Sequence, residues 1–144
     1  MPVLGIDLGS RRIGLAISDA EDRIALPAGS LESRGPKRDL KAVSALARER
    51  GVERVVVGLP IHMDGSQGPQ AEAARRFASS LAGELGIPVE TLDERWTTRE
   101  AERALDATGR RGRKRRKEVV DAVAATLLLR TFLARQDTSE TPAT

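Results

Sequence analysis

The sequence contains no cysteine and only three aromatic residues, Phe77, Trp96 and Phe132. The absence of cysteine excludes disulfides and thiolate metal sites. The scarcity of aromatic side chains argues against a base-stacking platform for single-stranded nucleic acid, which relies on several aromatic faces. No apolar run approaches the roughly 18 residues that a membrane-spanning helix needs. The first residues lack a basic segment and soon reach Asp7, so we expect no signal peptide and a cytoplasmic protein.

Positive charge is concentrated in one short segment. The 144 residues include 24 Lys or Arg and 21 Asp or Glu, which gives a net charge of +3. Residues 110–117 hold seven positive charges and no negative one, so the remainder of the chain carries −4. A local basic patch on an acidic body favours phosphate-rich partners.

The order of predicted elements indicates one α/β domain over residues 1–135. The gaps between the first three predicted strands are short and require antiparallel hairpins, and Pro27 and Gly29 place the third strand at an edge or a bulge. Residues 136–144 are predicted to form a disordered tail. The predicted strands are 3–8, 13–18, 24–31, 52–59 and 87–92, and the predicted helices begin at residues 36, 69, 97 and 119.

The fourth predicted strand contains Val55, Val56 and Val57, a β-branched run typical of a strand buried on both faces. Helical crossovers would add this strand and the fifth in parallel. The result is a five-stranded mixed sheet whose first three strands are antiparallel, with helices on both faces. This arrangement resembles the RNase H-like architecture.

Asp7 lies in the first predicted strand, whose other residues are apolar or glycine. A buried carboxylate costs free energy unless it is paired, hydrogen-bonded or bound to a cation. An Asx-type turn at Gly9 and Ser10 explains Asp7 equally well from the local sequence. A functional and a structural role are therefore both open at this position.

Asp93 and Glu94 directly follow the fifth predicted strand, at the edge where open α/β sheets bind ligands. Neighbouring residues of an extended chain point to opposite faces, so one carboxylate is expected to enter a site. The other would pair with a base such as Arg95 or face water. An ordinary charged loop between a strand and a helix is the alternative.

Asp121 is surrounded by apolar residues in the last predicted helix. The helix dipole favours an aspartate in the first turn but accounts for it only in part. Small neighbours such as Ala122 and Ala125 would let the helix approach the sheet closely. Carboxylates from the first strand, the end of the last strand and this helix could then converge. Oxygen clusters suit Mg²⁺ or Mn²⁺, and two such ions about 3.5–4 Å apart support phosphodiester hydrolysis.

Four motifs, taken in order, resemble the YqgF/RuvX family, whose members are also described as Holliday-junction resolvase-like proteins and pre-16S rRNA nucleases. The resemblance covers about residues 3–134 and implies an RNase H-like nuclease, dependence on a divalent metal, and a role in maturing the 5′ end of 16S rRNA. By position it gives active-site status to Asp7, Asp121 and the pair Asp93 and Glu94. The motifs are GIDLG at 5–9 with IGLA at 13–16, VGLP at 57–60 with MDGS at 63–66, DER at 93–95 with TTREA at 97–101, and VDAVAA at 120–125.

The resemblance does not separate Asp93 from Glu94. We favour Glu94 as the metal ligand, together with Asp7 and Asp121, because a longer side chain beyond the strand end can reach inward. His62 and Asp64 are interpreted as loop residues, since the Asp64–Gly65 step is a turn signal.

Basic residues near these carboxylates are the predicted nucleic-acid contacts. Arg11 and Arg12 either contact phosphate or are exposed hairpin arginines. Residues 110–117 are interpreted as a flexible clamp on backbone phosphates, with a solvated loop as the alternative. The predicted contacts are Arg11, Arg12, Arg95, Arg110, Arg111, Arg113, Lys114, Arg115, Arg116 and Lys117.

Other functions remain open from the sequence. Sugar kinases and actin-like ATPases share the core but need two such domains. A non-catalytic nucleic-acid-binding or ribosome-assembly factor would keep the fold and the patch. A Holliday junction resolvase in DNA recombination generally acts as a two-fold dimer. We expect a monomer or weak homodimer that binds nucleic acid and no membrane. Precursor rRNA is the first expected partner, branched or single-stranded DNA is the alternative, and the ribosomal subunit is a further partner.

Overall fold

The computed structural model describes residues 2–19, 21, 24–62, 64–94 and 123–135. It contains five labelled strands and two labelled helices, and residues 123–135 form a further helix. The strands are β1 (Val3–Leu8), β2 (Arg12–Ser18), β3 (Ala25–Glu32), β4 (Arg54–Leu59) and β5 (Val89–Asp93), and the helices are α1 (Pro36–Glu49) and α2 (Pro69–Leu85).

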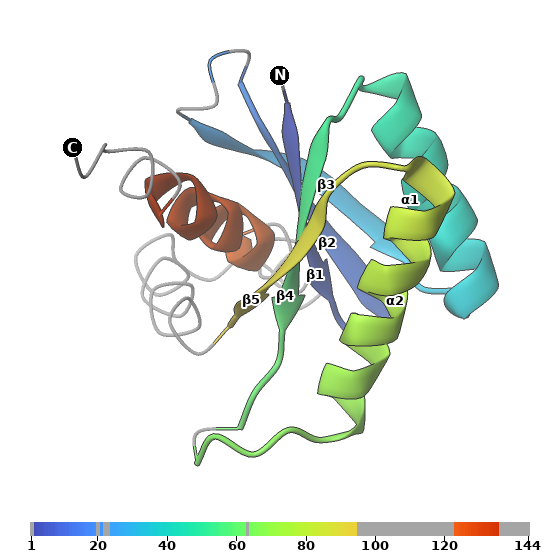
Figure 1. Cartoon of the computed structure of the whole chain (residues 1–144), viewed down its shortest axis with the longest axis vertical. Helices are drawn as coiled ribbons and strands as arrows, with labels where there is room; N and C mark the ends of the chain where they lie inside the picture. The colour runs from blue at the N-terminus through green and yellow to red at the C-terminus, as the bar shows by residue number, and fades with distance from the viewer. Residues whose placement is uncertain (1, 20, 22–23, 63, 95–122, 136–144) are drawn as a thin grey trace, which may run out of the picture.

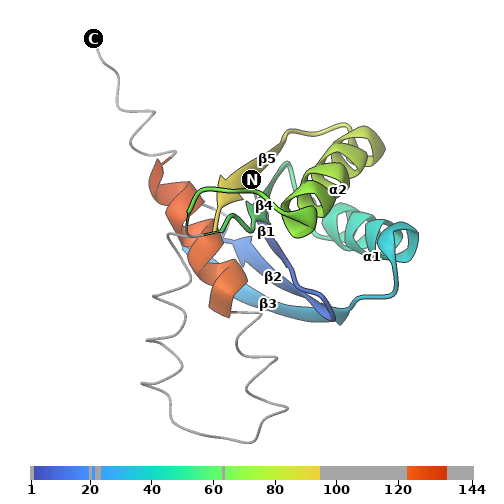
Figure 2. The same cartoon turned by 90° about the horizontal axis from the view of Figure 1, so that it is seen from below.

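The strands form one mixed sheet in the order β3-β2-β1-β4-β5 (Figure 1). β2 is antiparallel to both β1 and β3, whereas β4 is parallel to both β1 and β5. Helices α1 and α2 cover one face, and the helix of residues 123–135 covers the other (Figure 2). The predicted RNase H-like fold class is confirmed. The carboxyl ends of β1, β3, β4 and β5 therefore share one edge of the sheet, which Figure 2 views from below.

Predicted strand properties are found in the structure, with small shifts at the boundaries. Val55, Val56 and Val57 are fully buried in β4, and β3 is an edge strand that pairs irregularly with β2. Val52 stays outside β4 because its N–H donates to the carbonyl of Ala47 at the end of α1. The fifth strand ends one residue later than predicted, because Asp93 pairs with Leu59.

The sheet separates two hydrophobic clusters, and β1 contributes to both. Leu4 and Ile6 pack in the cluster beneath α1 and α2, whereas Val3 packs in the cluster with Leu128 and Leu129. Because side chains alternate along a strand, Asp7 points to the same face as Val3. Among the described residues, no helix is long and apolar enough to cross a membrane.

Gly5 allows the helix of residues 123–135 to lie close against β1. A Cβ placed on Gly5 would be 2.9 Å from the Cβ of Leu129 and 3.2 Å from the carbonyl oxygen of Ala125. Contacts this short leave no room for a side chain. Residue 7 is therefore on the face that this helix approaches most closely.

Candidate active site

Asp7 and Glu94 meet at the carboxyl edge of the sheet. Asp7 is near the end of β1, and Glu94 follows β5, where its N–H donates to the carbonyl of Leu59 over 3.0 Å. Both side chains are half-buried, and their carboxyl groups are hydrogen-bonded to each other. Because β4 lies between β1 and β5, the Glu94 side chain must cross β4 to reach Asp7.

Gly58 is the point at which Glu94 crosses β4. A Cβ on Gly58 would overlap Oε1 of Glu94 and would lie 2.8 Å from both its Cγ and its Cδ. The carboxyl group thus occupies the space that any other residue at position 58 would fill. The VGLP motif is visible in the sequence, but no local signal connects its glycine with Glu94.

Glu94 is electrostatically unfavourable as a carboxylate. Burial, the hydrogen bond with Asp7, and repulsion by Asp7 and Asp93 raise the pKa of Glu94 from 4.5 to about 9. With a pKa of about 9, Glu94 is protonated at neutral pH, and the proton lies in the hydrogen bond between the two carboxyl groups. A cation held by these carboxylates would offset the repulsion between them and so favour the ionised form of Glu94.

Asp93 and Glu94 occupy different positions in the structure. Asp93 pairs with Leu59 as the last residue of β5, and it raises the pKa of Glu94 by charge repulsion. Glu94 is the member of the pair that contacts Asp7. The two adjacent carboxylates thus have distinct positions, one within the sheet and one across its edge.

Arg11 and Arg12 stand on the turn that joins β1 to β2, at the same edge as Asp7. The turn is tight: the Gly9 N–H donates to the carbonyl of Arg12 over 2.8 Å, and a Cβ on Gly9 would lie 2.6 Å from that oxygen. Arg11 is exposed and Arg12 is half-buried. Both arginines therefore lie within a few residues of Asp7 along the chain.

The loop that follows β4 borders the same edge. Its turn is held by Asp64, whose Oδ1 accepts hydrogen bonds from the Ser66 N–H (2.8 Å) and hydroxyl (2.6 Å). These bonds lower the pKa of Asp64. His62 is exposed and packs against Gly68, beside a cavity of about 370 Å³. Asp64 is accounted for as a turn residue.

Several predicted site residues lie outside the described part of the chain: Asp121, Arg95 and the whole of 110–117. Within the described part, no group of three or more His, Cys, Asp or Glu side chains gathers as a metal site. What the described residues supply is a pair of carboxylates at the sheet edge.

Comparisons with known proteins identify the family. The family model described as "RuvX: Holliday junction resolvase" matches residues 1–135. A protein of Chloroflexus aggregans named "Putative pre-16S rRNA nuclease" is 48% identical over 131 residues, which are 91% of this chain and 92% of that protein. A protein of the same name from Pelotomaculum thermopropionicum is 45% identical over 137 residues, 94% of this chain and 88% of that protein.

Solved structures agree on the fold. T. thermophilus RuvC in complex with a Holliday junction substrate matches with a TM-score of 0.63 at 22% identity, covering 96% of this chain and 97% of that chain. The Fowlpox virus resolvase bound to Holliday junction DNA matches with a TM-score of 0.62 at 10% identity, covering 94% and 99%. At these identities the likeness concerns the fold alone. The family match and the close relatives go further, and by them the chain belongs to the RuvX family.

Proposed function

We propose that this chain is a divalent-metal-dependent nuclease that hydrolyses phosphodiester bonds and that its substrate is the precursor of 16S rRNA. The observation that carries the proposal is the contact between Asp7 and Glu94 at the carboxyl edge of the sheet. The names of the relatives at 45% and 48% identity support the choice of RNA. The proposed site belongs to one domain, residues 1–135, in a cytoplasmic protein.

The donor set fits Mg²⁺ or Mn²⁺. Both described groups offer carboxylate oxygens, the ligands that hard cations prefer. Burial and mutual repulsion raise the pKa of Glu94 to about 9, so a cation would stabilise the ionised form of the pair. We include Asp121 as a third ligand. In the helix that the sequence predicts from residue 119, Asp121 would share a face with Ala125, and Ala125 packs against Gly5 of β1.

The bound cations would activate water and stabilise the leaving oxygen, with two ions as the proposed arrangement. The protein's own contribution is positional. Gly58 and the hydrogen bond from the Glu94 N–H to Leu59 direct the Glu94 side chain across β4. Asp93, fixed in β5, adds negative charge beside Glu94 and so strengthens the attraction for cations.

The same proposal assigns nucleic acid to the basic residues. Arg11 and Arg12 are placed at the edge that carries Asp7, where they can contact phosphates on either side of a scissile bond. Arg95 and residues 110–117 would add a clamp whose affinity falls with salt. The ribosomal subunit would be the setting in which a precursor is bound. A monomer or weak homodimer suffices for one cut.

Holliday junction resolution is the second candidate, supported by the description of the matching family. Resolution generally needs two coordinated cuts and therefore two active sites related by symmetry. A non-catalytic assembly factor is the third candidate. It would bind the same nucleic acid without using the carboxylates.

A cleavage assay separates these candidates. A 16S precursor, a four-way junction and single-stranded DNA would be incubated with the wild type and Asp7→Asn in Mg²⁺ and in Mn²⁺. We expect cleavage of the precursor by the wild type and a loss of about 10²–10³-fold in rate for Asp7→Asn, since the site would lose one group that stabilises charge. Equal rates for the two proteins would refute the proposal, and binding without cleavage by either would favour the assembly factor.

A further inference from the structure

A second concentration of positive charge, outside residues 110–117, lies at the same edge of the sheet as the candidate active site, on the side of α1. It occupies the segment between β3 and α1 and the first turns of α1. All four of its cationic side chains are exposed. We name it the α1 basic surface, and it consists of Arg34, Lys37, Arg38 and Lys41.

The α1 basic surface is continuous with the turn that follows Asp7. Arg12 at the start of β2 pairs with Glu32 at the end of β3, and the Ser33 N–H donates to the carbonyl of Arg11 over 2.8 Å. The end of β3 is two strand spacings from β1, about 10 Å. Arg11, on the turn between β1 and β2, therefore lies along the edge between Asp7 and the end of β3.

The acidic residues among these cations do not neutralise them. Asp39 is buried, and its carboxylate accepts hydrogen bonds from the Ser33 hydroxyl (2.7 Å) and the Arg34 N–H (2.8 Å). These bonds fix the backbone that carries Arg34. Glu32 lies 3.7 Å from the Arg34 guanidinium, with 76% of its side chain exposed, so solvent weakens that pair. The four exposed cations and the two carboxylates thus leave this surface a formal net charge of +2.

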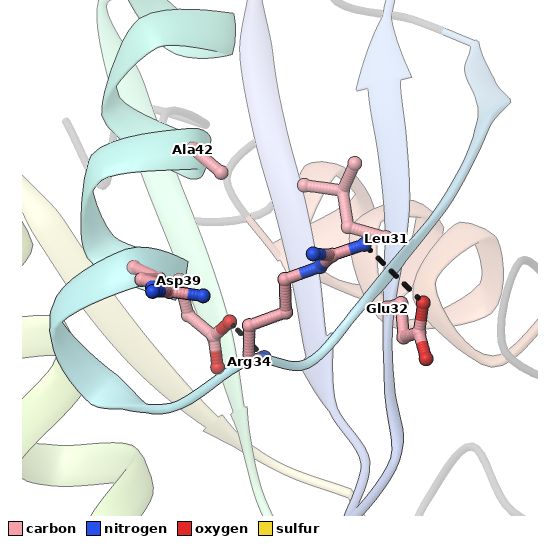
Figure 3. Close-up of a pocket in the computed structure, with 6 residues that line it drawn as sticks. Leu31, Glu32, Arg34, Asp39 and Ala42 are labelled. Atoms are coloured by element: carbon pink, nitrogen blue, oxygen red, sulfur yellow. Dashed lines mark hydrogen bonds and ion pairs between the residues drawn. The ribbon is translucent and has the colours of Figure 1, made fainter.

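The surface is hollowed as well as charged. A cavity of about 240 Å³ lies between the end of β3 and α1, and Figure 3 shows Arg34 beside it, extending toward Glu32. Arg38 lines the cavity from α1. Two arginines therefore line one concave place at the edge of the sheet that also carries Asp7.

We propose that the α1 basic surface binds the backbone of the nucleic-acid strand that leaves the active site across Arg11. This inference rests on the proposed function, because it takes the nuclease substrate as its partner. Guanidinium groups suit phosphate, since each offers paired N–H donors and a permanent charge. The contacts would position the strand without reading its sequence.

The test measures binding separately from cleavage. A fluorescein-labelled RNA containing the 5′ end of the 16S precursor would be titrated with the full chain in Ca²⁺, by fluorescence anisotropy at several KCl concentrations. Arg34→Gln/Arg38→Gln removes two charges from the surface. Arg48→Gln/Arg50→Gln is the matched control, because it removes two charges from the other end of α1. That end lies at the opposite edge of the sheet, where β1 and β4 begin and the Glu53 N–H donates to the carbonyl of Pro2.

We expect Arg34→Gln/Arg38→Gln to raise the Kd on the order of ten-fold at 0.1 M salt. The binding constant should also depend less steeply on salt. The magnitude of the negative slope of log binding constant against log salt should decrease by about 1.4, or about 0.7 for each lost contact to a single strand. The control should match the wild type in both. Equal Kd values and slopes for the two double variants would overturn the inference.

Wild-type behaviour separates this inference from the proposed function. If the wild type binds the RNA but does not cleave it in Mg²⁺ or Mn²⁺, the proposed nuclease activity is refuted, while RNA binding by the α1 basic surface is not. RNA that the wild type does not bind would refute the surface. Circular dichroism melts of both double variants establish that the compared proteins are folded.

Discussion

Glu94 crosses β4 at Gly58, whose missing side chain leaves the space in which the carboxyl group reaches Asp7. Residues from three strands are thereby linked: the carboxylate of β1, the glycine of β4 and the carboxyl group beyond β5. The atoms that a Cβ on Gly58 would meet belong to the flexible end of Glu94. A side chain at position 58 would therefore displace the site without disturbing the sheet.

The first prediction is that Gly58→Ala abolishes most of the activity of a folded protein. The methyl group would push the Glu94 carboxyl group away from Asp7, and a misplacement of about 1 Å can cost about 10²-fold in rate. The pKa of Glu94 should also fall from about 9 toward 4.5, since it loses the hydrogen bond with Asp7 and part of the repulsion. NMR titration of ¹³C-labelled glutamate would measure this shift.

Gly83→Ala is the matched control for that variant. Gly83 lies in α2, and a Cβ there meets no atom within 4 Å. Alanine in an exposed helix position should stabilise the fold by about 0.5–1 kcal/mol and leave the cleavage rate unchanged. Full activity in Gly58→Ala with an unaltered Glu94 titration would contradict the role assigned to the glycine.

The second prediction concerns pH. The pKa of Glu94 is about 9 in the folded protein and 4.5 without its environment, so the folded state holds a proton that the unfolded chain releases between these values. The contribution of protonated Glu94 to the free energy of unfolding is complete below pH 4.5 and is lost as pH rises toward 9. The free energy of unfolding of the metal-free protein should fall across this window, by at most about 1.4 kcal/mol per pH unit.

Urea denaturation at several pH values would measure this dependence. Glu94→Gln should reduce the slope and stabilise the metal-free protein at pH 8, because the neutral amide avoids burying a charge beside Asp7. Added Mg²⁺ or Mn²⁺ should oppose the loss in the wild type, but not in Glu94→Gln. A wild-type slope no steeper than that of Glu94→Gln would count against a shared proton in the site.

Much of the fold could be predicted from the sequence, because its signals are local. Short gaps between the first strands require hairpins, and the valine run at 55–57 identifies a strand buried on both faces. The position of Asp93 and Glu94 at the edge that carries Asp7 also follows from topology, since β1, β4 and β5 are parallel. Strand ends could be predicted only to within one or two residues.

What the sequence could not predict depends on contacts between distant residues. Gly58 and Glu94 are far apart along the chain, and nothing near either of them reveals that one side chain lies over the other. The same is true of Asp39, which reaches back to fix Arg34, so the α1 basic surface was not among the predicted contacts. The clustered charges of 110–117 were easier to notice because they are adjacent.

The third prediction is that Ser44→Ala stabilises the protein. Ser44 is 1% exposed, and its hydroxyl has no hydrogen-bond partner among the described residues. Removing a buried hydroxyl of this kind should raise the free energy of unfolding by about 1 kcal/mol. Ser79→Ala, at an exposed position of α2, corrects for the helix propensity of alanine. Equal stabilisation by the two variants in thermal denaturation would show that Ser44 carries no such penalty.

The fourth prediction tests the packing of the helix of residues 123–135 against β1. Alanine at position 5 would place a methyl group 2.9 Å from the Cβ of Leu129 and 3.2 Å from the carbonyl of Ala125, so the helix must move outward. Such overpacking costs about 1–3 kcal/mol, whereas a glycine-to-alanine change without strain stabilises by about 0.4–1 kcal/mol. Gly5→Ala should therefore lower the free energy of unfolding in urea.

The same variant should also lower the cleavage rate, because the proposed ligand Asp121 belongs to the sequence just before this helix. The rate should fall even at temperatures where the variant is still fully folded. Gly5→Ala with higher stability and the wild-type rate would mean that the helix can move away from β1 without consequence for the site.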